Sequence, residues 1–172
     1  MVMKLIISLL AIFWVCKITM AQSGKPMIGS DSGIKEKLVM IKNAFPDLVK
    51  AFGKNGQTSY GITDYQTDLK IGKSMIFLSK SALEQKLKIE FSNIYYSGTE
   101  DDFWKFGQEV NIYINDLFGD SYYSKPFQDG KNEALFYYEN GKDISDSPNV
   151  IEVDFNQEIG VDVDIIFHTE KQ

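Results

Sequence analysis

Residues 150–167 read VIEVDFNQEIGVDVDIIF, and this stretch decides the fold. Apolar and polar residues alternate over residues 150–155 and again over residues 161–167, a pattern typical of strands with one buried face. The segment 156–160 between them is short enough to join two adjacent strands. The sequence therefore predicts an antiparallel hairpin near the end of the chain.

The polar face of this hairpin is acidic. If Phe155 pairs with Val161, the same register places Asp154 opposite Asp162. Two positions further along the ladder, Glu152 then lies opposite Asp164. Like charges in opposed positions destabilise a sheet, so we expect something to offset them. These acids form the first set of candidate binding residues: Glu152, Asp154, Asp162 and Asp164.

The sequence leaves several offsets open. Lys86 and Lys88 alternate with apolar residues in the segment 83–96, so an adjacent strand can supply a lysine ladder. A hard cation such as calcium takes carboxylate oxygens as ligands. A basic partner protein is a third possible offset. Plain solvation of an exposed face is the interpretation we favour, since isolated surface pairs cost little. Whether a metal binds is not decided by the sequence.

The rest of the chain supplies further strands and two helices. One helix is predicted over residues 34–52, with a break or kink at Pro46 because proline lacks an N–H donor. A second helix follows Thr99, a suitable N-cap, and stops at Gly119. Further strands are predicted over residues 58–65, 69–78, 83–96 and 134–138, with a bulge near residues 92–93. This order predicts an α+β fold: a single antiparallel sheet of about five or six strands with two helices packed on one face.

The segment 120–132, after the second helix, is expected to be a polar loop. Exposed aromatic side chains favour contacts with proteins or sugars, because tyrosine combines apolar area with a polar tip. Three aromatic residues of this loop form the second set of candidate binding residues: Tyr122, Tyr123 and Phe127. Trp104 is expected in the core instead.

The N-terminus indicates export. Lys4 precedes the apolar run LIISLLAIFWVC at residues 5–16, and small residues follow at a suitable cleavage site. We therefore expect a signal peptide over residues 1–21, a flexible leader over residues 22–33 and a single globular domain over residues 34–172. The apolar run is too short for an ordinary membrane span, so no stable span should remain after cleavage. The expected location is secreted or periplasmic.

Composition argues against some classes of function. The chain has 172 residues, no arginine and one cysteine, Cys16, which lies inside the expected signal. After cleavage, 16 lysines stand against 24 acidic residues, a formal charge of −8, so we expect no nucleic-acid partner. No cofactor motif is present, and no cofactor is expected.

The function indicated is that of an exported, non-enzymatic domain that binds another macromolecule, a protein above all. The acidic sheet face or the aromatic loop would make the contact. Catalysis is disfavoured because the single histidine, His168, lies near the end of the chain without a marked nucleophile. The alternative is a small cell-envelope hydrolase that uses carboxylates. The oligomeric state is not indicated.

Overall fold

The computed structural model describes residues 24–30, 33–130, 132–157 and 160–170. The signal peptide expected over residues 1–21 lies outside them. The helices are α2 (Ile34–Ala44), α3 (Leu48–Phe52) and α4 (Glu100–Phe118), with one 3₁₀ turn, η1 (Ile144–Asp146). The strands are β1 (Lys54–Ser59), β2 (Ile62–Gln66), β3 (Met75–Lys80), β4 (Glu84–Ser92), β5 (Tyr122–Asp129), β6 (Asn132–Glu139), β7 (Asn149–Asn156) and β8 (Asp162–Glu170).

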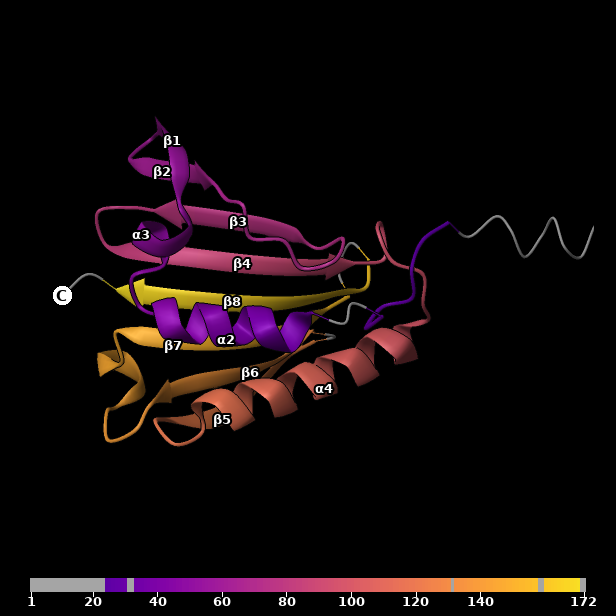
Figure 1. Ribbon diagram of the computed structural model, residues 1–172. Coiled ribbons are helices and arrows are strands. Elements are labelled where there is room, and N and C mark those ends of the chain that lie inside the picture. Colours follow the sequence, from indigo (N-terminus) through magenta and orange to yellow (C-terminus); the bar gives the residue numbers. More distant parts are fainter. Residues whose placement is uncertain (1–23, 31–32, 131, 158–159, 171–172) are drawn as a thin grey trace, which may run out of the picture.

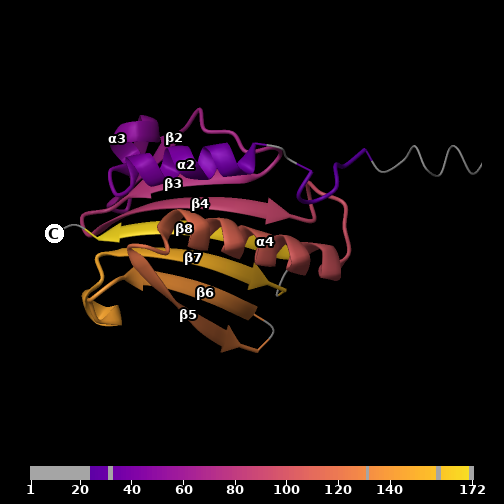
Figure 2. The same ribbon diagram turned by 60° about the horizontal axis from the view of Figure 1, so that its bottom comes forward.

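The strands form one antiparallel sheet, and the α-helices lie on one side of it (Figures 1 and 2). This confirms the α+β class and the single sheet. The expected count of five or six strands is wrong, because the sheet has eight. None of the helices in the described parts of the chain is long and apolar enough to cross a membrane.

The strand order β1-β2-β3-β4-β8-β7-β6-β5 reads as two copies of one motif. In each half, helical structure precedes a meander of four strands, with α2 and α3 before β1–β4 and α4 before β5–β8. The last strand of each half, β4 and β8, pair at the centre of the sheet. The two halves therefore stand in a relation of approximate twofold symmetry about the β4–β8 ladder.

The core lies between the sheet and the helices. Alternate residues of the central strands point into it, and Leu87 and Ile89 of β4 are fully buried, as is Ile165 of β8. Helix α4 presents the expected apolar stripe, with Val110 and Ile114 also at 0 % exposure. Its N-terminus is fixed by the predicted cap.

The cap of α4 is a reciprocal pair. The backbone N–H of Asp102 donates to the Thr99 hydroxyl oxygen over 3.3 Å, and the Thr99 N–H donates to the Asp102 carboxylate over 2.8 Å. Two N–H groups that the helix itself leaves unpaired are satisfied in this way.

The N-terminal half differs from expectation in its boundaries. The first helix ends at Ala44, before Phe45 takes up extended backbone, and α3 follows Pro46 as a separate turn of helix. The expected strand over residues 58–65 is a hairpin, which turns where Tyr60 and Gly61 have positive φ angles of 49° and 80°. Such a turn matches the twist of the flanking strands.

Two further strands are shorter than expected. The strand predicted over residues 69–78 begins only at Met75. The strand predicted over residues 83–96 ends at Ser92 without a bulge, because the N–H groups of Tyr95 and Tyr96 both donate to the Ser92 carbonyl and turn the chain out of the sheet.

The expected aromatic loop is a strand. Residues 122–129 form β5, the outermost strand on that side of the sheet, paired with β6 along its length. Pro126 made the segment look irregular, but an edge strand tolerates proline, since one side of its backbone needs no partner strand. Correcting this places the aromatic residues on defined faces of the sheet.

The terminal hairpin is present, but its register differs from the predicted one by two residues. β7 continues to Asn156, which pairs with Asp162, so Phe155 faces Val163. Asp154 consequently lies opposite Asp164 and not opposite Asp162. Glu152 lies opposite Ile166.

Part of the segment expected to be a leader packs against the domain. Met27 forms a parallel bridge with Ser97, and Ile28 is 9 % exposed within the apolar core. The Lys25 ammonium donates to the Asn93 carbonyl over 2.8 Å.

Candidate functional site

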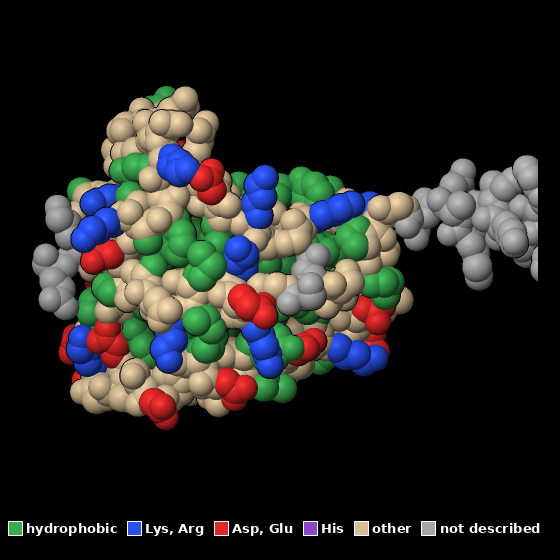
Figure 3. All heavy atoms as spheres, in the orientation of Figure 1, with side chains coloured by type: hydrophobic (Ala, Val, Ile, Leu, Met, Phe, Trp, Pro, Cys, Tyr) green, Lys and Arg blue, Asp and Glu red, His purple; other side chains and the backbone are tan. Residues whose placement is uncertain are grey.

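The side of the sheet away from the helices is the first candidate site, and we call it the open face. The described helices all lie on the opposite side (Figures 1 and 2). On that helix-bearing side, lysine and acidic side chains are interspersed over the surface (Figure 3). The predicted acids Glu152, Asp154, Asp162 and Asp164 all belong to the open face, since the residues between them point into the core.

Three acids line up across the centre of the open face. Glu90 of β4 is paired with Asp164 of β8, and Asp164 with Asp154 of β7. We call these residues the acidic triplet. Carboxylates in directly opposed positions repel one another, more strongly when they are withdrawn from water.

Lys88 offsets part of this repulsion. Its ammonium lies 2.8 Å from an Asp164 carboxylate oxygen and 2.9 Å from one of Glu90. Burial alone would lower the pKa of Lys88, but hydrogen bonds to Asp164 and Glu90 outweigh it and raise the pKa. A lysine from the adjacent strand therefore does pair with the acids, as one of the predicted offsets requires, but only Lys88 makes these contacts and not a ladder of two lysines.

Two members of the triplet, Asp164 and Asp154, have raised pKa values. Burial raises the pKa of Asp164 to about 6, with Lys88 opposing and the charges of Glu90 and Asp154 adding to the rise. Burial also raises the pKa of Asp154 to about 6, and the charge of Glu152 adds to it. One oxygen of Asp164, a residue only 5 % exposed, has no hydrogen-bond partner among the described residues.

The remaining predicted acids lie on opposite sides of the triplet along the strand direction. Asp162 pairs with Asn156 and Ser92 near the hairpin loop, with one buried carboxylate oxygen unpartnered among the described residues. Glu152 lies on the other side of Asp154, with an oxygen 3.4 Å from Nε2 of His168.

Next to the triplet, the open face is aromatic. The rings of Phe127 and Phe136 meet edge to face with centroids 6.1 Å apart, Phe136 stacks on Tyr138 at 6.2 Å, and Tyr138 lies 5.7 Å from Tyr123. We call these four residues the aromatic cluster. The register joins it to the triplet, since Ala134 pairs with Asp154 on one side and with Phe127 on the other.

Tyr122, the other predicted aromatic residue, does not belong to this site. Its ring packs edge to face on Phe118 at 5.7 Å on the helix side of the sheet, and burial raises its pKa to about 12. Because successive residues of a strand point to opposite faces, Tyr122 and Tyr123 had to separate once β5 was a strand.

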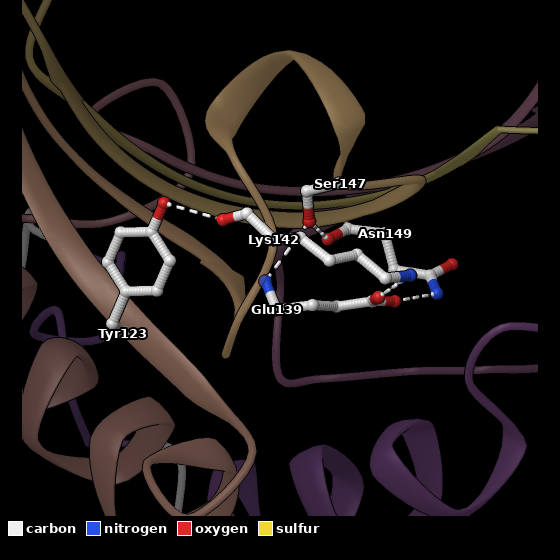
Figure 4. A network of polar contacts seen from close by, with 5 residues as sticks. All are labelled: Tyr123, Glu139, Lys142, Ser147 and Asn149. Atoms are coloured by element: carbon white, nitrogen blue, oxygen red, sulfur yellow. Dashed lines mark hydrogen bonds and ion pairs between the residues drawn. The ribbon is translucent and has the colours of Figure 1, made fainter.

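A polar network fixes the connection between β6 and β7 at one end of the cluster (Figure 4). Glu139 accepts from Lys142 and from the Asn149 amide, and these bonds outweigh burial and lower its pKa. The Glu139 N–H donates to the Ser147 hydroxyl over 3.0 Å, and Tyr123 donates to the Lys142 carbonyl over 3.3 Å. The network holds the loop and leaves the ring of Tyr123 at the border of the open face.

A second candidate site lies on the helix side. A cavity of about 400 Å³ opens between α4 and the strands β5–β7, and one of about 570 Å³ adjoins it near the start of α4. Trp104, Glu133 and Phe155 line both, so we call them together the α4 cleft. Sequence reasoning missed this site and assigned Trp104 to the core; its ring does pack on Phe155, 5.0 Å away.

The sequence contained partial signals for the site residues that were not predicted. Phe136 and Tyr138 alternate in a predicted strand, but their face could not be assigned without its neighbours. Lys88 was named as a possible offset, whereas Glu90 was not connected to the acids 60–75 residues later. Within the described residues, no group of three or more histidine, cysteine or acidic side chains is placed to hold a metal ion.

Comparisons of the chain with protein-family models, with characterised proteins and with solved structures find no match.

Proposed function

We propose that this protein is an exported, non-enzymatic binding domain whose open face receives a basic segment of a partner protein. The observation that carries the proposal is the acidic triplet beside the aromatic cluster, on a sheet face that the described helices leave bare. Export is inferred from the N-terminal sequence.

The charges on the face select the partner's chemistry. Around the triplet, Glu90, Asp164, Asp154 and Asp162 have one ammonium, that of Lys88, within bonding distance of two of them. Asp154 has no ion pair with Lys88. A lysine or arginine from a partner would pair with this carboxylate, and its charge would also stabilise the ionised form of Asp164.

The aromatic cluster supplies the apolar part of the contact. Phe127 is 56 % exposed, and tyrosine and phenylalanine side chains bury a large area at protein interfaces. Their faces also attract a cation that lies over them. A partner segment that carries a basic side chain flanked by apolar ones fits both halves of the site.

The proposal predicts binding that depends on pH. Because the pKa values of Asp154 and Asp164 lie at about 6, both are largely ionised at pH 8 and largely protonated at pH 5. Attraction to a basic segment should therefore weaken as the pH falls through 6.

Calorimetric titration with a short peptide that alternates lysine with valine tests this. We expect saturable binding at pH 8 that falls at pH 5 and is lost with a peptide carrying glutamate for lysine. Asp154→Asn and Phe136→Ala should weaken it, whereas Asp116→Asn, an exposed acid on α4, should not. Equal loss in the Asp116 variant would show nonspecific charge attraction and contradict the proposal.

One observation favours a second function. Asp154 and Asp164 are paired carboxylates with pKa values of about 6, as a general acid near neutral pH requires. A hydrolase of this kind would release reducing ends from cell-wall glycan, and Asp164→Asn would abolish the release. Turnover by the unaltered protein would replace the first proposal.

A further inference from the structure

We infer that the α4 cleft is a second binding site, on the helix side of the sheet, and that it takes an amino-sugar oligosaccharide. Its two cavities, about 400 and 570 Å³, are each of the size that small-ligand sites have. They meet at Trp104, Glu133 and Phe155, so the site is elongated, as a ligand of several linked rings requires.

The lining of the cleft sets the chemistry of the ligand. Gln108, Asn111 and Gln128 border the cavity of about 400 Å³, and each side-chain amide both donates and accepts hydrogen bonds. The hydroxyl groups of a sugar likewise donate and accept hydrogen bonds, so they can pair with these amides. Trp104 adds an aromatic surface against which the C–H face of a sugar ring packs.

The charge of the cleft excludes anionic ligands. Glu100, Asp101 and Glu133 border the cavity of about 570 Å³, Asp154 is among the residues that line the other, and no lysine is among the described residues that line either one. Asp101 is paired with Lys105 at 2.9 Å, and Glu100 accepts from Gln157 over 2.6 Å. Glu133 is therefore the carboxylate we assign to the amino group of a sugar.

Gly107 lies in the middle of α4 and also lines the cleft. A Cβ placed there would meet Val163 at 3.7 Å, an ordinary contact, so packing does not require glycine. Glycine within a helix is less favourable than alanine, since it loses more backbone freedom on folding. A role for glycine in keeping the cleft open accounts for its presence.

The fluorescence of Trp104 gives a direct readout. The exported protein is titrated with N,N′,N″-triacetylchitotriose, with its deacetylated form and, as a control, with maltotriose. We expect a saturable change with at least one amino sugar, and weaker binding or none with maltotriose. Trp104→Phe removes the fluorophore, so binding by this variant is measured by calorimetry, where we expect it to be weakened. No saturable change with either amino sugar, or tighter binding of maltotriose, would overturn the inference.

Two variants distinguish a ligand-binding role of the cleft residues from a role in stability alone. Gly107→Ala should raise the melting temperature, because the helix gains, and yet weaken sugar binding several-fold, because the cleft narrows. Glu133→Gln should weaken binding of the deacetylated sugar and leave the acetylated one unchanged. Unaltered binding in Gly107→Ala would contradict the assignment of the cleft.

A peptide ligand and the open face are tested in parallel. Binding of the tripeptide Ala-Lys-Ala in the cleft without binding of either amino sugar would overturn the inference. Glu90→Gln should not affect sugar binding, because Glu90 belongs to the acidic triplet and lines neither cavity, so failure of the sugar-binding test leaves the proposed partner site untouched.

Discussion

Asp154 is a member of the acidic triplet whose ionisation costs the fold free energy. Its pKa rises from 3.8 to about 6, so the stability it contributes is present below pH 3.8 and is lost as the pH rises through 6. The sequence placed this acid on the right face. The residue opposite Asp154 could not be predicted from the sequence, because the register of β7 and β8 depends on one extra pair next to the loop, Asn156 with Asp162.

We therefore expect Asp154→Asn to raise the free energy of unfolding at pH 8. Asparagine keeps the shape and removes a half-buried charge, and about 1 kcal/mol is expected after allowance for solvent screening. At pH 4 the native side chain is already neutral, so the gain should vanish. Urea unfolding at the two pH values measures it, and an equal gain at both would contradict the raised pKa.

Lys88 should be the residue whose loss the triplet tolerates least. Lys88→Met leaves Asp164 and Glu90 without their cation, and we expect a loss of about 1–3 kcal/mol at pH 8 and a smaller loss at pH 5. Lys86→Met, on the same face of the same strand, is the matched control and should cost less. Thermal melts of both variants compare the two losses, and an equal loss of stability in Lys86→Met would contradict the role of Lys88 in the triplet.

At the scale of elements, the sequence predicted correctly those helices and strands whose ends and buried face are set by neighbouring residues. Helix α4 followed from Thr99, the acids after it and an apolar stripe, and the structure keeps all three. Strand β5 was missed, because the edge of a sheet accepts Pro126 where a central strand would not. The α4 cleft was missed for a related reason: it exists only where α4 and β5–β7 come together.

The packing of α4 has its own test. Val110 is fully buried against the sheet, so Val110→Asp should unfold the domain or cost several kcal/mol. Ile112, on the same helix, is 59 % exposed, and Ile112→Asp should leave the melting temperature nearly unchanged. If circular dichroism melts of the two variants coincide, the face of the helix has been misassigned.

At the scale of the molecule, the decisive feature is the β4–β8 ladder, which joins the two halves of the chain. Glu90 and Asp164 meet there although 73 positions separate them. No periodicity along the sequence reveals which strands become neighbours, so the number of strands in one sheet, the approximate symmetry and the acidic triplet all lay beyond sequence reasoning.

The central claim is that the open face contacts a basic protein, and site-specific crosslinking tests it most directly. A photoreactive benzoylphenylalanine replaces Phe136 at the centre of the aromatic cluster or, as the control, Ile112 on the helix side. Irradiation in cells that produce the protein should yield one defined adduct at position 136, on a lysine- or arginine-rich segment identified by mass spectrometry. No adduct at position 136, an adduct with a second copy of this chain, or the same adducts at position 112 would contradict the account.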